Sequence, residues 1–289
     1  MRTKTTAFDV FLVILMILLS CAFLYPLLNM LALSVSDAQT LKSSPIYLLP
    51  VGFSLESYKA LLNDSRILLY YWNTVKYAAV GTVIMLLTTS LMAYPLSITA
   101  LRGRKLISVI LTITMFFGGG LIPYYVTIMR LKLIDTFWVM VLPGAISAYN
   151  VIVFKTFFMS IPESLKESAF LDGAGHLRVL FSIVLPLSKA VLATFALFSI
   201  VGYWNDYLTA LLYLRDDRKY PIQLLMRRLL VLMDYKDAST AQLLKDFRSI
   251  SSRTTKAAAT IITVVPILCV YPFMQKYFAK GVLVGSIKA

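Results

Sequence analysis

A chain of 289 residues that is 59% hydrophobic and only 15% charged, with a mean hydropathy of +0.78, is too apolar for a soluble globular domain. Ordinary globular chains are about half apolar and a quarter charged. The net charge of +14 does not indicate nucleic-acid binding, because the basic residues lie between apolar runs, where anionic lipid and membrane topology account for them. We therefore expect a membrane protein.

Charged residues divide the sequence into six apolar runs, each close to the roughly 20 residues that a helix needs to cross a bilayer. The first run is uncharged from Val10 to Ser36 and contains no small-residue cleavage site, so it is expected to stay in the membrane. Runs of this length are too long for barrel strands. We predict an all-α, polytopic protein with one transmembrane domain over residues 1–289. The predicted spans are residues 10–33, 73–98, 106–129, 136–158, 188–214 and 257–277.

Glycine and proline interrupt several of these runs. Gly118-Gly119-Gly120 and Pro123 break the third, Pro143 the fourth and Pro266 the sixth. Broken helices are tolerated in a membrane where protein or a wet cavity satisfies the freed backbone groups. The breaks therefore place these three spans near the centre of the bundle, unless they are proline kinks with a packing role alone.

The stretch from residue 160 to residue 187 is charged and broken by glycine. Ser160 and Glu163 have the spacing of a capping box, with Pro162 in the first turn, which predicts that a helix begins at this point. In that helix Lys166 and Glu167 occupy wet positions. Leu165, Ala169 and Phe170 form its apolar side.

Asp172-Gly173 is expected to end this helix, because glycine accepts the left-handed conformation of a C-terminal cap at little cost. A second short helix is expected from about Leu177 to the start of the next span near Pro186. Two short helices at a fixed angle would form a rigid projection from the membrane.

This stretch resembles the EAA loop of the permeases of ABC importers, in which Glu-Ala-Ala is followed by three variable residues and a glycine, with a later Leu-Pro. The matching residues are Glu167, Ala169, Asp172, Gly173, Ala174, Phe181, Leu185 and Pro186. Ser168 replaces the usual second alanine, and Ala190 stands where a further proline is common. The resemblance covers nearly the whole chain and is greatest to the maltose-permease-like carbohydrate branch, especially to permeases for complex oligosaccharides, which share endings like residues 271–278.

The resemblance implies the transmembrane domain of a type I ABC importer in the bacterial cytoplasmic membrane. Its implied partners are ABC ATPase subunits, which bind ATP and Mg, a second homologous permease, an extracytoplasmic sugar-binding protein and an oligosaccharide substrate. The coupling loop 160–187 would dock on the ATPase, and alternating access would move the substrate. The residues implied in this coupling are Glu167, Ser168, Ala169, Asp172, Gly173, Ala174, Phe181 and Pro186.

The distribution of positive charge does not fix the orientation by itself. With both termini in the cytoplasm, the inside segments carry 12 Lys and Arg residues and the outside segments carry 15. Without the loop 215–256 the count becomes 12 against 5 and satisfies the positive-inside rule. Because loop 160–187 can meet an ATPase only in the cytoplasm, the resemblance implies that both termini are cytoplasmic.

The loop 215–256 is predicted to contain a basic amphipathic helix. Within residues 221–233, one face carries Ile222, Leu225, Met226, Leu229 and Met233, and another carries Arg227 and Arg228. Ser239 and Gln242 can cap a second short helix through Phe247. The loop either lies in the lipid interface or, as the resemblance implies, contacts the binding protein through Arg218, Arg227 and Arg228.

The same loop has ten basic and five acidic residues. We therefore raise the hypothesis that the transported sugar is acidic.

The sequence contains no catalytic set. It has one histidine, His176, two cysteines without metal-ligand spacing, Cys21 and Cys269, and no phosphate-binding loop. We therefore predict a transport subunit that is not an enzyme, has no metal site and no cofactor of its own, and receives its energy from a partner.

Polar residues inside spans normally face the interior of a helical bundle. Amides, a carboxylate and aromatic rings of this kind suit the binding of sugars. The predicted pathway residues are Asn73, Tyr149, Asn150, Trp204, Asn205 and Asp206. The alternatives are hydrogen bonds between helices, aromatic belts at the membrane interface and, for Asp206, a proton relay.

Three other classes of function compete with an ABC permease. A secondary transporter or channel would show repeated halves or intramembrane charge pairs, and a membrane enzyme would show clustered His, Asp or Glu. Neither pattern is clear in this sequence. A scaffold without a substrate is the third.

Overall fold

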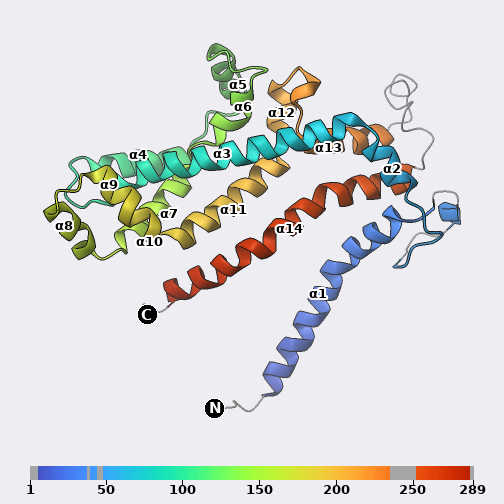
Figure 1. The fold of residues 1–289 in the computed structure, drawn as a ribbon, viewed down its shortest axis with the longest axis horizontal. Helices are drawn as coiled ribbons and strands as arrows, with labels where there is room; N and C mark the ends of the chain where they lie inside the picture. The colour runs from blue at the N-terminus through green and yellow to red at the C-terminus, as the bar shows by residue number, and fades with distance from the viewer. Residues whose placement is uncertain (1–5, 38–39, 44–47, 235–251, 287–289) are drawn as a thin grey trace. The chain divides into compact units, whose positions relative to one another are not determined.

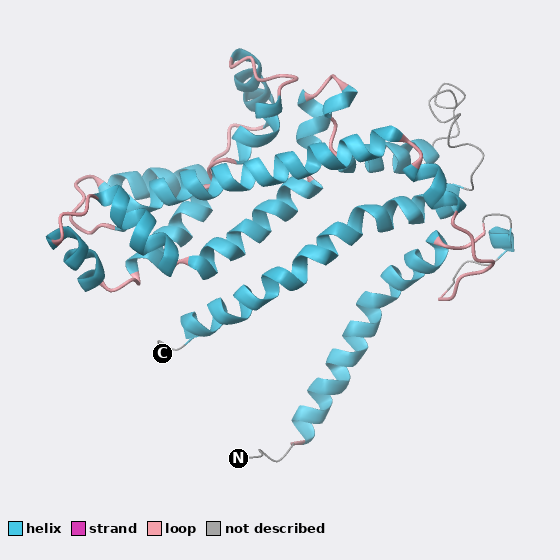
Figure 2. Ribbon diagram, viewed as in Figure 1, coloured by secondary structure: helices cyan, strands magenta, loops and turns pink. Residues whose placement is uncertain are grey.

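The computed structural model describes residues 6–37, 40–43, 48–234 and 252–286. Within these ranges the chain forms helices and no strand, which confirms the all-α prediction (Figure 2). The described residues belong to two compact units. One is drawn from Met1–Leu68 and Leu225–Pro266, and the other from Leu69–Leu224 and Ile267–Ala289.

The first unit contains α1 (Ala7–Ser34), whose side chains are exposed over most of its 28 residues. Its N-terminus is capped by Thr6 and Asp9, since the Thr6 N–H donates to Asp9 Oδ2 over 2.8 Å. An apolar helix with almost no protein contact suits a lipid environment or another chain. α1 contains the predicted span 10–33.

Other helices of this unit are connected to one another and to α1 by hydrogen bonds between hydroxyl groups. The unit includes η1 (Thr40–Ser43), α2 (Glu56–Leu62) and the first part of α14 (Ser252–Ser286). Tyr58 OH donates to Ser34 Oγ over 2.8 Å, and Ser57 Oγ donates to Thr254 Oγ1 over 3.0 Å. These hydroxyl pairs join α1, α2 and α14 where apolar packing is slight.

The predicted interruption at Pro266 is wrong, because α14 runs through Pro266 as one helix. Proline removes one backbone donor, and a membrane helix accepts this loss when neighbouring groups satisfy the freed carbonyl.

The second unit begins within α3 (Ser65–Ser97), a 33-residue helix. The helices that follow α3 are α4 (Arg104–Phe116), α5 (Leu121–Arg130), α6 (Phe137–Val141), α7 (Ala148–Met159), α8 (Glu163–Leu171), α9 (His176–Val179), α10 (Leu185–Leu187), α11 (Lys189–Asn205) and α12 (Leu208–Tyr213) (Figure 1). Between them lie the 3-10 helices η2 (Leu142–Gly144) and η4 (Asp217–Lys219) and the π-helix η3 (Leu180–Val184). α13 (Ile222–Asp234) starts in this unit.

Two of the described helices, α1 and α3, are each long and apolar enough to cross a membrane. If each of three bent helix pairs also counts as one span, the number of candidate spans in the described residues rises to five. The pairs are α4 with α5, bent by 115°, α6–η2 with α7, bent by 50°, and α9–α10 with α11, bent by 82°. The first bend confirms the break predicted at Gly118-Gly119-Gly120. The count of six spans stays a prediction.

The core of the second unit lies where α3, α4, α7, α9–η3 and α11 meet. Its centre is aromatic: Phe154 packs edge-on against Phe158 and Phe195, with ring centroids 5.8 and 5.2 Å apart. The buried members are Met85, Ala93, Tyr94, Leu96, Leu111, Val151, Phe154, Phe158, Ile161, Val179, Leu180, Val184 and Phe195. Because Val179, Leu180 and Val184 belong to this core, the segment that contains α8 and α9 is packed onto the bundle.

The structure confirms the amphipathic helix predicted over 221–233 within the described side chains. Ile222 and Met226 of α13 are buried, whereas Arg227 and Arg228 are exposed. The side chains of Leu229 and Met233, and the helix predicted through Phe247, lie outside the described residues.

Candidate functional site

The first candidate region is the coupling segment, residues 160–187. Its helix α8 does not begin with the predicted capping box, which is a correction. Ser160 ends α7 instead, and its Oγ donates back to Phe157 O over 2.7 Å. Pro162 is the N-cap of α8, with φ −51° and ψ 130°. Pro162, in an extended conformation, separates α7 from α8. The Ser160 hydroxyl therefore bonds to the last turn of α7 and does not cap α8.

The end of α8 is the predicted glycine cap. Gly173 has φ +79°, its N–H donates to Phe170 O over 3.0 Å, and the Ala174 N–H donates to Ala169 O over 2.9 Å. These two hydrogen bonds form a Schellman motif, which satisfies the last carbonyls of the helix and fixes the direction of the chain beyond it.

A second helical stretch follows without interruption from His176 through η3 to Leu187. It begins one residue before the predicted start at Leu177 and contains Pro186 near its end. Val179, Leu180 and Val184 are fully or almost fully buried. The coupling segment is therefore a helix, a fixed turn and a second helix that is held by the core.

The two sides of α8 agree with the prediction only in part, since Glu167 is exposed as expected. Lys166, expected to be wet, donates from Nζ to Phe158 O over 3.0 Å, and partial burial lowers the pKa of its amine. Leu165 and Phe170, predicted to belong to the apolar side of α8, are 43% and 39% exposed. Ala169 and Ala174 pack against the core. Small alanines allow α8 to approach the bundle, and this turns its larger apolar side chains outward.

The structure leaves most of the predicted coupling residues accessible: Glu167, Ser168, Asp172, Gly173, Phe181 and Pro186 are exposed, and Ala169 and Ala174 are half-buried. The sequence interpretation missed Leu171, which is 89% exposed, and Leu177, which is 64% exposed. Both are large apolar residues that flank a glycine turn between charged positions, a pattern that could have singled them out. The coupling segment therefore exposes both large apolar side chains and acidic ones.

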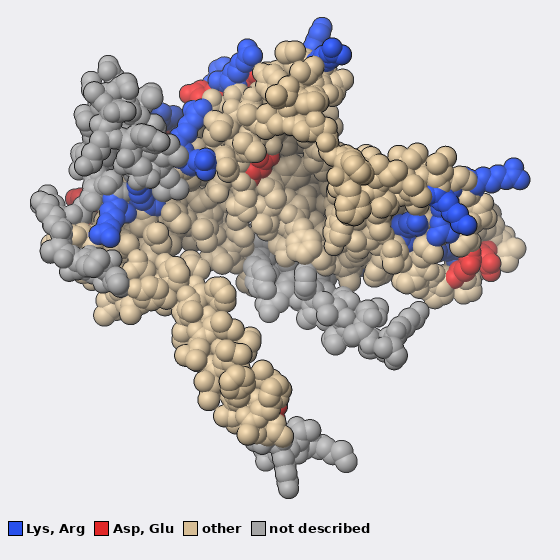
Figure 3. All heavy atoms as spheres, turned by 180° about the vertical axis from the view of Figure 1, so that it is seen from behind, with Lys and Arg blue, Asp and Glu red and all other residues tan. Residues whose placement is uncertain are grey.

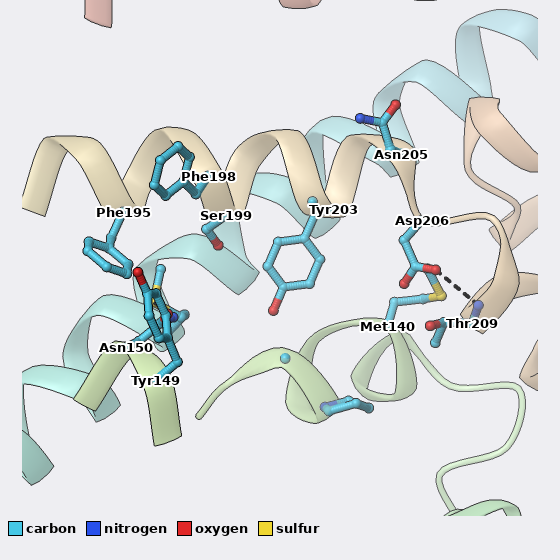
Figure 4. A pocket seen from close by; sticks show the side chains of 14 residues that line it. Met140, Tyr149, Asn150, Phe195, Phe198, Ser199, Tyr203, Asn205, Asp206 and Thr209 are labelled. Carbon is cyan, nitrogen blue, oxygen red and sulfur yellow. Dashed lines mark hydrogen bonds between the residues drawn. The ribbon is translucent and has the colours of Figure 1, made fainter. Parts of the chain in front are cut away.

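The second region is a cavity of about 590 Å³ in the second unit. It opens where the chain bends between η2 and α7 and between α11 and α12, and Figure 4 shows rings toward one end and Asp206 with Thr209 toward the other. Its lining residues are Met85, Met140, Pro143, Gly144, Tyr149, Asn150, Phe195, Phe198, Ser199, Gly202, Tyr203, Asn205, Asp206 and Thr209. Four of the six predicted pathway residues are among them.

The polar groups of this cavity have local hydrogen bonds. Asp206 Oδ1 accepts from the Thr209 N–H over 3.0 Å and so caps α12 (Figure 4). Asn205 Nδ2 donates to Val201 O over 3.0 Å. Tyr149, at 55% exposure, lies with its ring centroid 6.3 Å from that of Phe195. The cavity thus combines aromatic faces with amide and carboxylate oxygens.

The other two predicted pathway residues lie elsewhere. Trp204 is 6% exposed and packs against Tyr71, with ring centroids 5.9 Å apart. Asn73 is 3% exposed, and its Nδ2 donates to Arg218 O and Tyr220 O over 2.7 and 3.1 Å. Neither residue lines the cavity. Asn73 therefore joins α3 to the segment 215–222, which includes the short helix η4.

Tyr203 lines the cavity in addition to the predicted pathway residues. Its ring lies against Gly81 and Gly144, and its OH donates to Val141 O over 3.0 Å. One side chain of α11 therefore contacts both α3 and the α6–η2 segment. A second cavity of about 500 Å³, lined by Gly118-Gly119-Gly120 and Tyr124, shares Thr209 with the first.

The third region is the segment 215–222, which is held by Asp135. The backbone N–H groups of Arg215 and Asp216 each donate to Asp135 Oδ1 over 3.1 Å. Lys219 Nζ donates to Asp135 Oδ2 over 3.0 Å and to its carbonyl oxygen over 2.6 Å. Asp135 has φ +58°. Non-glycine residues adopt this conformation rarely, and Asp and Asn accept it best.

The Asp135 hydrogen bonds give a first prediction. Partial burial raises the pKa of Asp135, but donors from Asp216, Lys219 and Arg215 outweigh burial and hold this pKa below its ordinary value. A lowered pKa in the folded state means that the carboxylate stabilises the protein above its ordinary pKa, near 3.9, and that this stabilisation is lost as the pH falls through the lowered value. Asp135→Ala is expected to lower the free energy of unfolding by about 1–3 kcal/mol at pH 7.

Thermal unfolding in detergent at pH 7 and at pH 3 measures this effect. The loss caused by Asp135→Ala should be smaller at pH 3. Asp135→Asn is the matched variant: it keeps one acceptor oxygen and tolerates a positive φ, so its loss at pH 7 should be smaller. An equal destabilisation by both variants would contradict the role of the hydrogen bonds.

The predicted basic contacts lie at or near the same segment. Arg218 is exposed, and its Nη2 lies 3.0 Å from Asp216 Oδ2, an ion pair that lowers the pKa of Asp216. Arg227 and Arg228 of α13 are also exposed. Figure 3 shows that charged atoms gather in limited areas of the face drawn, while most of that face is uncharged. This pattern suits a protein whose surface is largely covered by lipid or by other subunits.

Bent apolar helices around a cavity, with a two-helix segment exposed beside their core, suit a membrane transport subunit. The chain belongs to the family described as "binding-protein-dependent transport system inner membrane component", whose model matches residues 5–284. It is therefore an inner-membrane transport subunit.

The chain is similar to several known permeases. It is 37% identical over 285 residues to the polygalacturonan/rhamnogalacturonan transport system permease protein YtcP of Bacillus subtilis (strain 168), covering 99% of each chain. It is 39% identical over 263 residues to protein LplC of the same strain, covering 91% of this chain and 88% of LplC. It also resembles a chain in the crystal structure of a bacterial ABC transporter involved in the import of the acidic polysaccharide alginate, with 31% identity, a TM-score of 0.85 and coverage of 96% and 100%.

Proposed function

We propose that this chain is a permease subunit that imports a carbohydrate, an oligosaccharide with acidic sugars, from an extracytoplasmic binding protein into the cytoplasm. A second, similar permease completes the translocation pathway. ABC ATPase subunits bind ATP and Mg and drive alternating access, and both termini of this chain are cytoplasmic. The relatives' substrates, polygalacturonan, rhamnogalacturonan and alginate, support the substrate class. The excess of basic residues in loop 215–256 supports an acidic sugar.

The coupling segment is the observation that carries this proposal. Its exposed apolar residues, Leu171 and Phe181 among them, are what a partner's cleft would bury. Glu167 and Asp172 are exposed beside them and would pair with basic or amide groups of the ATPase. Because the Schellman turn and the buried Val179, Leu180 and Val184 make the segment stiff, movement of the ATPase would move the bundle rather than bend the contact.

The cavity suits the passage of a sugar. Tyr149, Phe195 and Phe198 offer faces on which the C–H side of a pyranose can stack, and Asn150, Asn205 and Asp206 offer acceptors and donors for its hydroxyls. Its lining contains a carboxylate and no Lys or Arg. Recognition of the acidic groups would therefore fall to the basic loop and to other subunits.

Co-purification tests the coupling proposal. A Leu171→Asp, Phe181→Asp double variant is expected to lose at least about tenfold of its bound ATPase subunit in mild detergent, because two charges would be buried without partners. Leu101→Asp is the matched control: Leu101 is 36% exposed in the turn before α4, outside the coupling segment. Equal ATPase retention by the double variant and the control would refute the docking surface.

Uptake measurements test the substrate. Cells that carry the assembled importer should take up an oligogalacturonide better than a neutral oligosaccharide of equal length. Tyr149→Ala should lower this uptake several-fold while leaving the bound ATPase in place. Equal uptake of the two sugars would remove the acidic preference, and uptake without any ATPase subunit would favour a secondary transporter.

A further inference from the structure

The helix α3 contacts all three regions described above: the coupling segment, the cavity and the segment 215–222. It is one uninterrupted helix (Figure 1), whereas the other candidate spans in the described part of this unit are bent pairs. Asn73 and Tyr94 are separated by 21 residues along α3, which corresponds to about 32 Å at the rise of an α-helix. This is close to the apolar thickness of a bilayer, roughly 30 Å.

Near its first end α3 holds the segment 215–222. The buried Asn73 donates to two carbonyl groups of that segment, as described above. The next residue, Thr74, accepts at Oγ1 from the Ile222 N–H over 2.9 Å, and Tyr77 OH donates to Lys219 O over 2.8 Å. Because these residues lie on consecutive turns of α3, the segment is fixed to the helix in both position and direction.

In its middle α3 contacts the wall of the cavity. Gly81 receives the ring of Tyr203, and Thr82 Oγ1 donates to Ser199 Oγ of α11 over 3.1 Å. Met85 lines the cavity, and Asn150 Nδ2 lies 3.6 Å from its sulfur atom. A displacement of α3 would therefore move the cavity wall on two sides.

At its other end α3 meets the coupling segment through the shared apolar core and, beside it, through His176. The ring of Tyr94, which is 4% exposed, lies edge-on to His176 with centroids 6.2 Å apart, and Tyr94 OH is 3.4 Å from His176 Nδ1. His176 in turn packs edge-on against Phe170 of α8, with centroids 4.9 Å apart. His176 thus lies between the exposed helix α8 and α3.

We infer that α3 is a rigid link that carries a displacement of the coupling segment to the cavity wall and to the segment 215–222, with His176 and Asn73 as positioning residues at its two ends. This inference rests on the proposed docking of an ATPase on the coupling segment. An unbroken helix with side-chain contacts at both ends transmits a displacement, whereas a bent pair can absorb it at its break. The alternative routes contain bends of 115°, 50° and 82°.

A reporter at the far end tests the link. Asp217 is exposed in the segment 215–222. A fluorophore on Asp217→Cys, in a chain carrying Cys21→Ser and Cys269→Ser and assembled with its ATPase, should change its emission when ATP is added. His176→Ala should reduce this change at least about threefold, and His176→Phe should restore most of it because a ring is retained. Thr99→Ala, at an exposed position outside the coupling segment, is the control and should leave the change as it is.

Variants at the two ends of α3 show whether one route carries the displacement. A full response from His176→Ala would overturn the link. Asn73→Ala should also reduce the response, and His176→Ala with Asn73→Ala should be no worse than the stronger single variant, because both act on one route. Additive losses would show two independent routes and overturn the inference. A wild-type complex that binds no ATPase would refute the proposed function itself, and the link with it.

Discussion

Replacing Gly173 by valine is expected to lower uptake at least about fivefold, while the chain still folds and binds its ATPase. Gly173 has φ +79°, and a Cβ built on it would meet nothing within 4 Å. The penalty is therefore backbone strain rather than a clash, roughly 1–2 kcal/mol for an L-residue in this conformation. The chain can relieve this strain by turning α8 relative to α9, which misplaces the docking surface.

Two substitutions give this experiment its controls. Gly173→Asn should retain more uptake, because asparagine tolerates a positive φ. Gly175→Ser should be close to wild type, since Gly175 has φ −78° at the N-cap of α9 and has open space around its Cα. Uptake is measured per assembled complex. Normal uptake by Gly173→Val would show that the angle between the two helices is not important.

The second large effect is expected at Gly144. A Cβ on Gly144 would lie 2.7 Å from Tyr203 Oη and 3.2 Å from Cζ, so Gly144→Ala should destabilise the chain by about 1–3 kcal/mol, the usual cost of overpacking. The ring cannot easily retreat, because it also rests on Gly81 and its OH is bonded to Val141 O. Thermal unfolding in detergent measures the loss.

Tyr203→Phe tests whether the hydroxyl oxygen of Tyr203 causes the clash with a Cβ at position 144. In the Tyr203→Phe background the clashing oxygen is absent, so Gly144→Ala should cost much less stability there than in the wild-type chain, while Tyr203→Phe alone loses the hydrogen bond to Val141 O. The same change should not rescue Gly81→Ala, because a Cβ on Gly81 would meet the ring carbons themselves. Gly202→Ala, which has open space, is the matched neutral control. Rescue of both glycine variants, or of neither, would contradict this arrangement.

Much of the coupling segment could be predicted from the sequence, because its turn depends on local backbone chemistry. Only glycine adopts the left-handed conformation without strain, so Asp172-Gly173 predicts the end of α8 regardless of what surrounds it. The start of α8 was mispredicted for a related reason. The Ser160 hydroxyl could either cap α8 or bond to the last turn of α7. Because Pro162 is extended and separates the two helices, the hydroxyl bonds to α7.

The sequence by itself determined the class of protein, the membrane helices, the glycine turn and the family, since each depends on composition, local conformation or residue spacing. Only the tertiary structure decided that Asn73 holds the segment 215–222, that Tyr203 fits between Gly81 and Gly144, and that Leu171 faces outward. These facts depend on which residues far apart in the chain become neighbours. Polar and aromatic residues in apolar runs look alike in sequence whether they join helices or line a cavity, and packing alone distinguishes the two.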